Sequence, residues 1–193
     1  MASLEETYHI AMIRLDLADI PQHSLPKGYS IRTYRPGDEE HWVRIHEKAD
    51  THQEVTLETF RQSFGDDLSA MQDRGFFLET AESEVVGTAT AWYEMGFHGK
   101  DYGLVHWVAI VPEHQGRGLS KALLSRVMNR LAQSHEGGLL RTSADRIPAI
   151  HLYLNYGFRP LYYEQACAGE WERVKKELSH PLLDNRPIFV KDL

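Results

Sequence analysis

Hydrophobic and polar residues alternate in several short stretches of the chain, which is the pattern of strands with one buried face. One further stretch, residues 104–111, is short and almost wholly apolar, as expected for a strand buried on both faces. Together these patterns predict strands at residues 8–15, 29–34, 76–80, 85–93, 104–111, 139–142 and 158–163.

Between these stretches, apolar residues recur with a period near 3.6 residues, which predicts helices between the strands. The clearest stripe repeats every four residues from Leu119 to Leu131, and Gly137-Gly138 is expected to end that helix. Another helix is expected to begin at Asp38, its predicted N-cap, and to bury Trp42. Further helices are expected over 57–71, broken near Gly65, and over 148–156 and 168–178, with an extended tail from residue 181. Strands interleaved with helices indicate a mixed α/β sheet domain.

Composition narrows the function classes. The chain has 193 residues, 28 acidic and 21 basic side chains and a formal net charge of −7, which argues against a sequence-independent nucleic-acid binder. The single cysteine, Cys167, excludes an internal disulfide framework and a multi-cysteine zinc site. The first six residues carry acids where a signal peptide needs bases, and no apolar run approaches about 18 residues. We therefore expect a cytoplasmic protein with no membrane or nucleic-acid partner.

A glycine-containing turn joins the apolar stretch 104–111 to the helix beginning near Leu119. Backbone N–H groups at such a helix start lack partners within the helix, and the helix dipole adds partial positive charge. Gly116 and Gly118 allow a ligand to approach the backbone closely. The turn is therefore a candidate pyrophosphate site, with a plain tight turn as the alternative. A dinucleotide fingerprint and a P-loop both fit badly, because Lys121 follows and no Gly-Lys-Ser/Thr is present.

Two separated motifs resemble the GNAT N-acetyltransferases. Gln115-x-x-Gly118-x-Ser120 is similar to the family's Arg/Gln-x-x-Gly-x-Gly/Ala signature, and residues 149–158 are similar to its Ala-Ile-x-Leu-Tyr-x-x-x-Gly-Phe helix end. The resemblance covers about residues 29–163. It implies a twisted mixed sheet flanked by helices, with splayed central strands that form a cleft for acetyl-CoA, the cosubstrate. Ser120 and Arg146 depart from the usual residues, and the segment after residue 163 does not match the usual last strand.

The resemblance also assigns roles to individual residues. It implies that backbone groups of the strand pair with the pantetheine amides and that the turn holds the pyrophosphate. Residues 106, 108 and 110 lie on one strand face if the ladder is regular. The residues expected to bind the cofactor are Val108, Ile110, Gln115, Gly116, Arg117, Gly118, Leu119 and Ser120.

Three side chains are candidates for proton transfer. Tyr153 corresponds to the family's thiolate-protonating tyrosine, and an amphipathic core tyrosine is the alternative. His106 occupies the strand position where some members place a glutamate base, with a hydrogen-bonded core histidine as the alternative. Glu94 is a competing base, or simply an exposed acid. No histidine spacing indicates a metal site, so we expect none.

These observations predict an N-acetyltransferase that moves an acetyl group directly to a primary amine of a small molecule or peptide in a ternary complex. The alternatives are an acyl-CoA-binding regulatory module without turnover and transfer of a longer acyl chain. The expected organisation is an N-terminal extension (1–28), the acetyltransferase domain (29–163) and a C-terminal helix and tail (164–193). A homodimer is the candidate assembly. The acceptor pocket is expected at residues 42–64 and 93–102, where aromatic residues stand beside acids such as Asp50.

Overall fold

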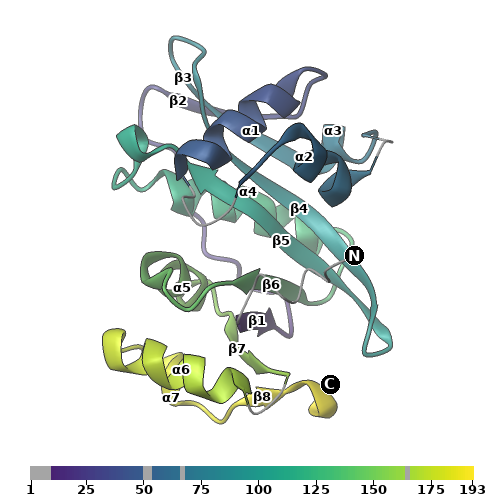
Figure 1. Ribbon diagram of the computed structural model, residues 1–193, viewed down its shortest axis with the longest axis vertical. Coiled ribbons are helices and arrows are strands. Elements are labelled where there is room, and N and C mark those ends of the chain that lie inside the picture. The colour runs from purple at the N-terminus through teal and green to yellow at the C-terminus, as the bar shows by residue number, and fades with distance from the viewer. Residues whose placement is uncertain (1–9, 50–53, 66–67, 164–165) are drawn as a thin grey trace. The chain divides into compact units, whose positions relative to one another are not determined.

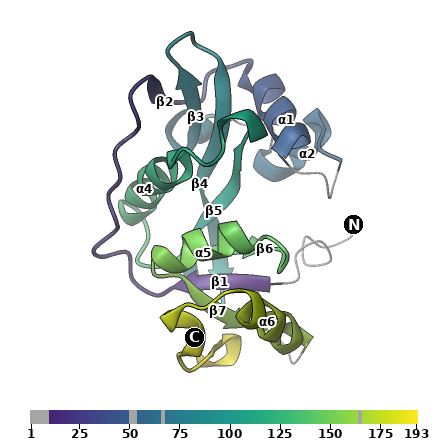
Figure 2. The ribbon, with the colours of Figure 1, turned by 90° about the vertical axis from the view of Figure 1, so that its left-hand side faces the viewer.

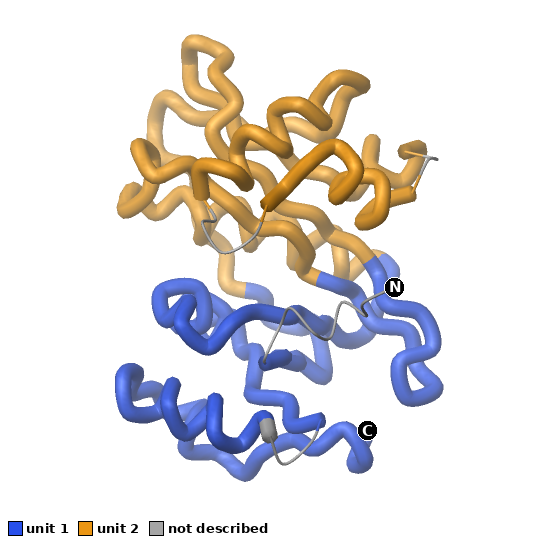
Figure 3. Tube along the Cα trace, viewed as in Figure 1, with its two compact units in different colours: residues 1–20, 93–104, 134–193 blue, residues 21–92, 105–133 orange. Residues whose placement is uncertain are grey.

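The computed structural model describes residues 10–49, 54–65, 68–163 and 166–193 (Figure 1). Its strands form one mixed sheet in the order β2-β3-β4-β5-β6-β1-β7-β8, flanked by helices. The chain divides into two compact units (Figure 3): unit 1 holds residues 1–20, 93–104 and 134–193, and unit 2 holds residues 21–92 and 105–133. Strands β4 (Val85–Phe97) and β5 (Lys100–Ile110) each contribute residues to both units.

Unit 2 is built on antiparallel pairing of strands that are close in sequence. Strand β2 (Tyr29–Thr33) pairs with β3 (Gly75–Thr80), and β3 pairs in turn with β4. Helices α1 (Asp38–Ala49) and α2 (Leu57–Phe64) lie on one face of these strands, and α4 (Leu119–Ala132) lies on the other (Figure 2). The short helices of this unit are α3 (Met71–Arg74) and the 3₁₀ turn η2 (Pro112–His114).

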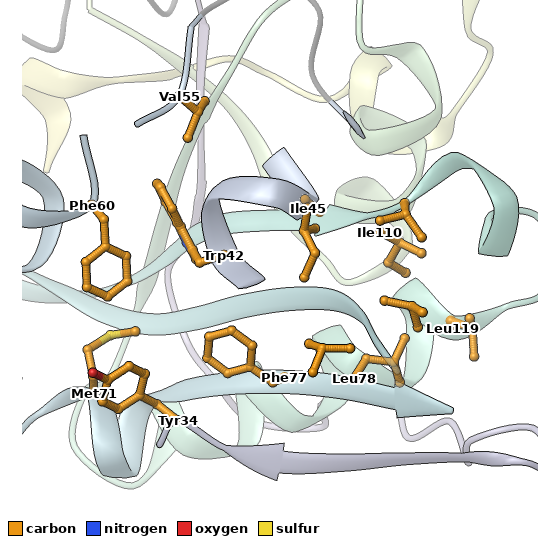
Figure 4. Close-up of a cluster of buried hydrophobic side chains, with 14 of the residues drawn as sticks. Tyr34, Trp42, Ile45, Val55, Phe60, Met71, Phe77, Leu78, Ile110 and Leu119 are labelled. Atoms are coloured by element: carbon orange, nitrogen blue, oxygen red, sulfur yellow. The ribbon is translucent and has the colours of Figure 1, made fainter. Parts of the chain in front are cut away.

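The core of unit 2 joins α1 and α2 to the sheet. Trp42 lies between Phe60 and Ile45 in Figure 4, and Phe77 belongs to the strand beneath them. All four side chains are fully buried. The rings of Trp42 and Phe60 meet edge to face at 5.2 Å between centroids, which is the arrangement that aromatic pairs favour. The burial of these four large apolar side chains holds α1 and α2 against the strands that precede the candidate site.

Unit 1 is centred on strand β1 (Ile10–Arg14), which pairs antiparallel with both β6 (Gly138–Thr142) and β7 (Arg159–Tyr162). The initial part of β5 pairs parallel with β6, and β8 (Ile188–Phe189) pairs parallel with β7. The helical elements of unit 1 are α5 (Ile147–Asn155), α6 (Ala166–Glu177), α7 (Pro181–Asp184) and the 3₁₀ turn η3 (Val190–Asp192).

The mixed α/β architecture predicted from the sequence is confirmed, and each predicted strand is present with shifted ends. The strand predicted at 8–15 is described from Ile10, because residues 8 and 9, like the acidic start of the chain, lie outside the described residues. The break expected near Gly65 is confirmed: α2 ends at Phe64, and Gly65 has a left-handed φ of 78°. The second helical piece was expected to end at residue 71, but α3 begins at that residue. The extended tail expected from residue 181 is wrong, because α7, β8 and η3 form there.

One predicted helix boundary is confirmed and another is wrong. Helix α1 begins at Asp38 as predicted, but the Asp38 carboxylate is directed towards the preceding residues: it accepts from the backbone N–H of Arg35 at 2.6 Å and binds the guanidinium of Arg32 at 2.5 and 2.8 Å. Helix α4 ends at Ala132, well before the two glycines expected to end it. A Cβ at Gly137 would stand 2.9 Å from the Tyr102 ring and 3.0 Å from a backbone oxygen, so this glycine serves close packing.

No helix within the described ranges is long and apolar enough to cross a bilayer.

Candidate functional site

The turn between β5 and α4 has the backbone that an anion site requires. Gly116 and Gly118 have φ values of 74° and 78°, in the left-handed region that side chains with a Cβ rarely adopt. Gly118 is the N-cap of α4 and supplies no side chain to bond the first N–H groups. A Cβ placed at either glycine meets no protein atom within 4 Å. The open space in front of the helix start fits the phosphate oxygens of the cosubstrate implied by the sequence.

Side chains in this turn bind the protein itself. The amide Nε2 of Gln115 donates to the carbonyl oxygen of Ile110 at 2.7 Å, which joins the turn to the end of β5. The guanidinium of Arg117 donates to the Tyr29 hydroxyl and to the Glu113 carbonyl, both at 3.1 Å. Gln115 therefore fixes the position of the turn, and Arg117 rests against β2 and η2.

Strand β5 is irregular at the point that leads into this turn. Trp107 has a φ of 50°, a left-handed value that interrupts the regular ladder assumed when residues 106, 108 and 110 were expected to share one face. Val108 is half-buried. The Ile110 side chain is buried in the unit 2 core, as Figure 4 shows, so any contact of this residue with a ligand would have to be made by its backbone.

His106 lies beside two aromatic rings of unit 2. Its imidazole is 6.0 Å from the Phe64 ring and 5.6 Å from the Trp107 ring, measured between centroids. The residue is half-buried. This partial exposure distinguishes His106 from a fully enclosed core histidine, which could not reach a substrate proton.

Tyr153 belongs to unit 1 and lies on the face of α5 that packs inwards. Its ring meets Phe158 edge to face at 6.2 Å, and its backbone carbonyl accepts from the Phe158 N–H at 3.1 Å. The residue is 8% exposed and therefore almost fully buried. This contact explains why the helix-end motif combines a tyrosine with a phenylalanine five residues later.

Glu94, the second candidate base, is held by an arginine of the neighbouring strands in unit 1. Its Oε2 lies 3.0 Å from a guanidinium nitrogen of Arg141. Burial alone would lower the pKa of Arg141, but hydrogen bonds and charge from Glu94 and Tyr163 outweigh it and raise that pKa. The carboxylate of Glu94 is thus engaged by Arg141 in unit 1.

The residues expected to line the acceptor pocket differ in their burial. Trp42 is fully buried in the unit 2 core, whereas Tyr93 is exposed and Asp50 lies outside the described residues. Among the residues that the structure describes, no group of three or more His, Cys, Asp or Glu side chains is arranged to hold a metal ion.

Two functional candidates were missed by the sequence analysis. Trp107 gave no signal, because periodicity cannot distinguish a left-handed residue within an apolar strand. Arg141 did give a sequence signal, because it is the lone charged residue in the strand Gly138–Thr142. A charge that is partly buried in a strand needs a partner.

A comparison with known families matches residues 34–158 to the Acetyltransferase (GNAT) family. Among curated proteins, mycothiol acetyltransferase of Streptomyces griseus is 31% identical over 153 residues, which cover 77% of this chain and 48% of that protein. Mycothiol acetyltransferase of Saccharomonospora viridis is 34% identical over 151 residues, covering 72% and 48%. The chain thus spans about half the length of the curated relatives it matches.

Solved structures share the fold. A GCN5-related N-acetyltransferase from Sphaerobacter thermophilus superposes with a TM-score of 0.65 at 22% identity, covering 78% of this chain and 47% of that one. The ribosomal-protein-S18-alanine N-acetyltransferase of Escherichia coli gives a TM-score of 0.55 at 20% identity, covering 71% and 85%.

Proposed function

Because this chain belongs to the GNAT acetyltransferase family, we propose that it transfers an acetyl group from acetyl-CoA to a primary amine by direct transfer in a ternary complex. The observation that carries the proposal is the turn Gln115–Ser120, whose left-handed glycines open the start of α4 towards a ligand. Acetyl-CoA, when bound, supplies an activated acyl group on a thioester. The backbone at Val108 and Ile110 would hold its pantetheine arm, and the turn from Gln115 to Ser120 would hold its pyrophosphate.

The reaction requires two proton transfers, and we assign them to two side chains. His106 accepts the amine proton, because imidazole is the side chain whose charge changes near neutral pH and this residue is half-buried rather than enclosed. Tyr153 donates a proton to the departing thiolate, as a phenol that stays protonated at pH 7 is able to do. Glu94 is the weaker candidate for the base, because turnover through it would disrupt its ion pair with Arg141.

For the acceptor, we propose a small-molecule amine. The curated relatives are named mycothiol acetyltransferases, so a mycothiol-related amine is the first compound to test. Peptide amines belong in the same panel, since the fold is shared with an enzyme named for a ribosomal-protein alanine. Residues 29–163 remain our proposed acetyltransferase domain, with 1–28 and 164–193 as its extensions.

Binding of CoA tests the proposal directly. Calorimetry should show that Gly118→Glu weakens CoA binding by on the order of 2 kcal/mol, because the carboxylate repels the phosphates and removes their backbone contacts. Gly96→Glu is the matched control, since Gly96 is also left-handed and also faces open space. Equal CoA affinities of the wild type and a folded Gly118→Glu protein would contradict the site.

Turnover separates the enzyme from the alternative, a regulatory module that binds acyl-CoA. The involvement of Glu94 in an ion pair is the observation that keeps this second candidate in view. Release of free thiol from acetyl-CoA in the presence of one amine of the panel supports the enzyme. Tight CoA binding with no thiol release for any amine supports the module instead.

A further inference from the structure

The left-handed backbone of Trp107 needs an explanation in terms of its side chain. Glycine adopts a φ of 50° without strain, whereas a tryptophan adopts it only where the surroundings hold it there. The strand continues on both sides of this residue, so the distortion is confined to one position of β5. The contacts of the indole are therefore the candidates for what stabilises the kink.

Helix α2 supplies that contact. The indole Nε1 of Trp107 donates to the hydroxyl of Ser63 at 3.0 Å, and this hydroxyl donates in turn to the carbonyl oxygen of Thr59 at 2.8 Å. The Ser63 hydroxyl thus acts at once as an acceptor from the indole and as a donor to α2. Thr59 is itself fixed, because it forms a capping box with Thr56 at the start of α2.

The indole ring is enclosed as well as hydrogen-bonded. Its centroid lies 4.8 Å from the Trp42 ring and 5.0 Å from the His46 ring, with interplanar angles of 69° and 77°. Trp42 and His46 come from α1 and are buried. The side chain of Trp107 is consequently oriented by both helices, with the Ser63 hydroxyl as its polar contact.

The kink changes which way neighbouring side chains point. In a regular strand, residues 106 and 107 would lie on opposite faces. Here the His106 ring approaches Phe64 of α2 at 6.0 Å while the Trp107 ring approaches Trp42 of α1 at 4.8 Å, so both lie on the helix side. The peptide groups around residue 107 are therefore turned relative to a regular ladder, directly before Val108.

We propose that Ser63 and Trp107 are positioning residues for CoA. The Ser63 hydroxyl holds the indole, the indole holds the left-handed backbone at residue 107, and that backbone sets the direction of the Val108 peptide groups. This inference rests on the proposed function, in which Val108 and Ile110 contact the pantetheine arm. It adds a residue on α2 that touches no ligand yet determines the shape of the binding strand.

Three variants isolate the hydrogen bond. Ser63→Ala removes the acceptor, Trp107→Phe removes the donor and keeps an aromatic ring, and Ser63→Thr keeps a hydroxyl. Calorimetry with CoA should show an affinity loss of about 2- to 10-fold for each of the first two, the range expected for one neutral hydrogen bond. The double variant Ser63→Ala/Trp107→Phe should be no weaker than either single variant, because both remove the same bond. Ser63→Thr should bind CoA as the wild type does.

Chemical shifts in amide spectra distinguish a positioning role from a general loss of stability, because they report the local geometry at residues 107–110. In ¹H–¹⁵N spectra without ligand, Ser63→Ala should shift the Trp107 indole signal and the backbone signals of Val108 and Ile110. The exposed Ser179→Ala control should leave all of these and the CoA affinity unchanged.

The outcomes are distinguishable. Wild-type CoA affinity in a folded Ser63→Ala protein, or additive losses in the double variant, overturns the positioning role and leaves the proposed function intact. Failure of the wild type to bind CoA overturns both. If Ser63→Ala does not fold, Trp107→Phe tests the same bond from its other side, and unchanged affinity there is equally decisive.

Discussion

The side-chain amide of Gln115 donates to the backbone carbonyl of Ile110 at 2.7 Å, which ties the glycine turn to the end of the strand that precedes it. A glutamine in the family signature would be expected to contact the phosphates, but here its amide is directed to the protein. The contact holds the start of α4 at a fixed distance from the strand that would carry the pantetheine arm. Its contribution is therefore pre-organisation of the binding backbone.

This role predicts the effect of Gln115→Leu. The variant keeps the size of the side chain but loses the donor, so the turn is released and CoA affinity should fall by about 5- to 10-fold, as expected for one lost hydrogen bond. Calorimetry with CoA measures the change. Gln133 is an exposed glutamine just beyond the end of α4, so the control variant Gln133→Leu should bind CoA as the wild type does. An undiminished affinity of Gln115→Leu would show that the turn keeps its shape without this contact.

The Glu94–Arg141 pair makes a prediction about stability. Glu94→Gln leaves the partly buried guanidinium of Arg141 without its carboxylate, which should lower the free energy of unfolding by about 1–3 kcal/mol. The double variant Glu94→Gln/Arg141→Gln removes both charges and should recover part of the loss. Urea denaturation of the wild type, the two single variants Glu94→Gln and Arg141→Gln, and the double variant measures this coupling. Equal stability of the wild type and Glu94→Gln would mean that the pair is a surface contact without structural weight.

His180 gives the fold a pH dependence. Its Nδ1 accepts from the N–H of Leu182 at 3.2 Å and caps α7, which requires an unprotonated Nδ1. Burial, and then the nearby His151, lower the pKa of His180 below its ordinary value of 6.5. The unfolded chain therefore takes up this proton first, so the stabilisation is complete above about pH 6.5 and is lost as pH falls below it.

The matching measurement compares unfolding free energies at pH 7.5 and 5.5 for the wild type and His180→Asn. Asparagine also accepts at an N-cap but does not titrate, so the variant should lose less stability on acidification than the wild type does. A difference of the same size in both proteins would assign the pH dependence to other groups.

The elements that the sequence predicted well are those whose periodicity is long and regular. The stripe beginning at Leu119 is a full amphipathic face, and its helix is present. Errors arose where a tertiary contact decided the local structure: Arg32 draws Asp38 back towards the preceding strand, and Tyr102 packs against Gly137. Arg32 lies six residues before Asp38 but in another element, and Tyr102 lies far from Gly137 in sequence, so the helical periodicity does not carry this information.

The candidate site likewise has one part that the sequence predicted and one part that it did not. Its glycine turn was predictable, because left-handed residues at a strand-to-helix junction favour glycine. The bond from Trp107 to Ser63 was not, because 44 residues separate the two partners and neither residue type is unusual in its own element. A backbone distortion such as the one at Trp107 opposes local preference, and its position emerges only from the folded contacts.

Tyr153→Phe tests the proposed general acid. The phenylalanine preserves the edge-to-face contact with Phe158 but has no proton to donate. CoA affinity should be unchanged, while turnover with an accepted amine should fall by about 10²- to 10⁴-fold. Tyr156→Phe, at the end of the same helix, is the matched control and should retain turnover. A turnover number for Tyr153→Phe equal to that of the wild type would remove this residue from the mechanism.

His106→Ala tests the proposed base through the pH dependence of kcat/KM. For the wild type, kcat/KM should rise through a group that titrates at about pH 6–7, because an imidazole must be unprotonated to accept the amine proton. The substrate amine also titrates, so the profile must be measured with several amines of different pKa. A limb that stays fixed across the amines belongs to the enzyme, and His106→Ala should abolish it while leaving CoA affinity unchanged. A limb that follows the amine and survives in His106→Ala would exclude this histidine, and Glu94→Gln then becomes the variant in which the limb should disappear.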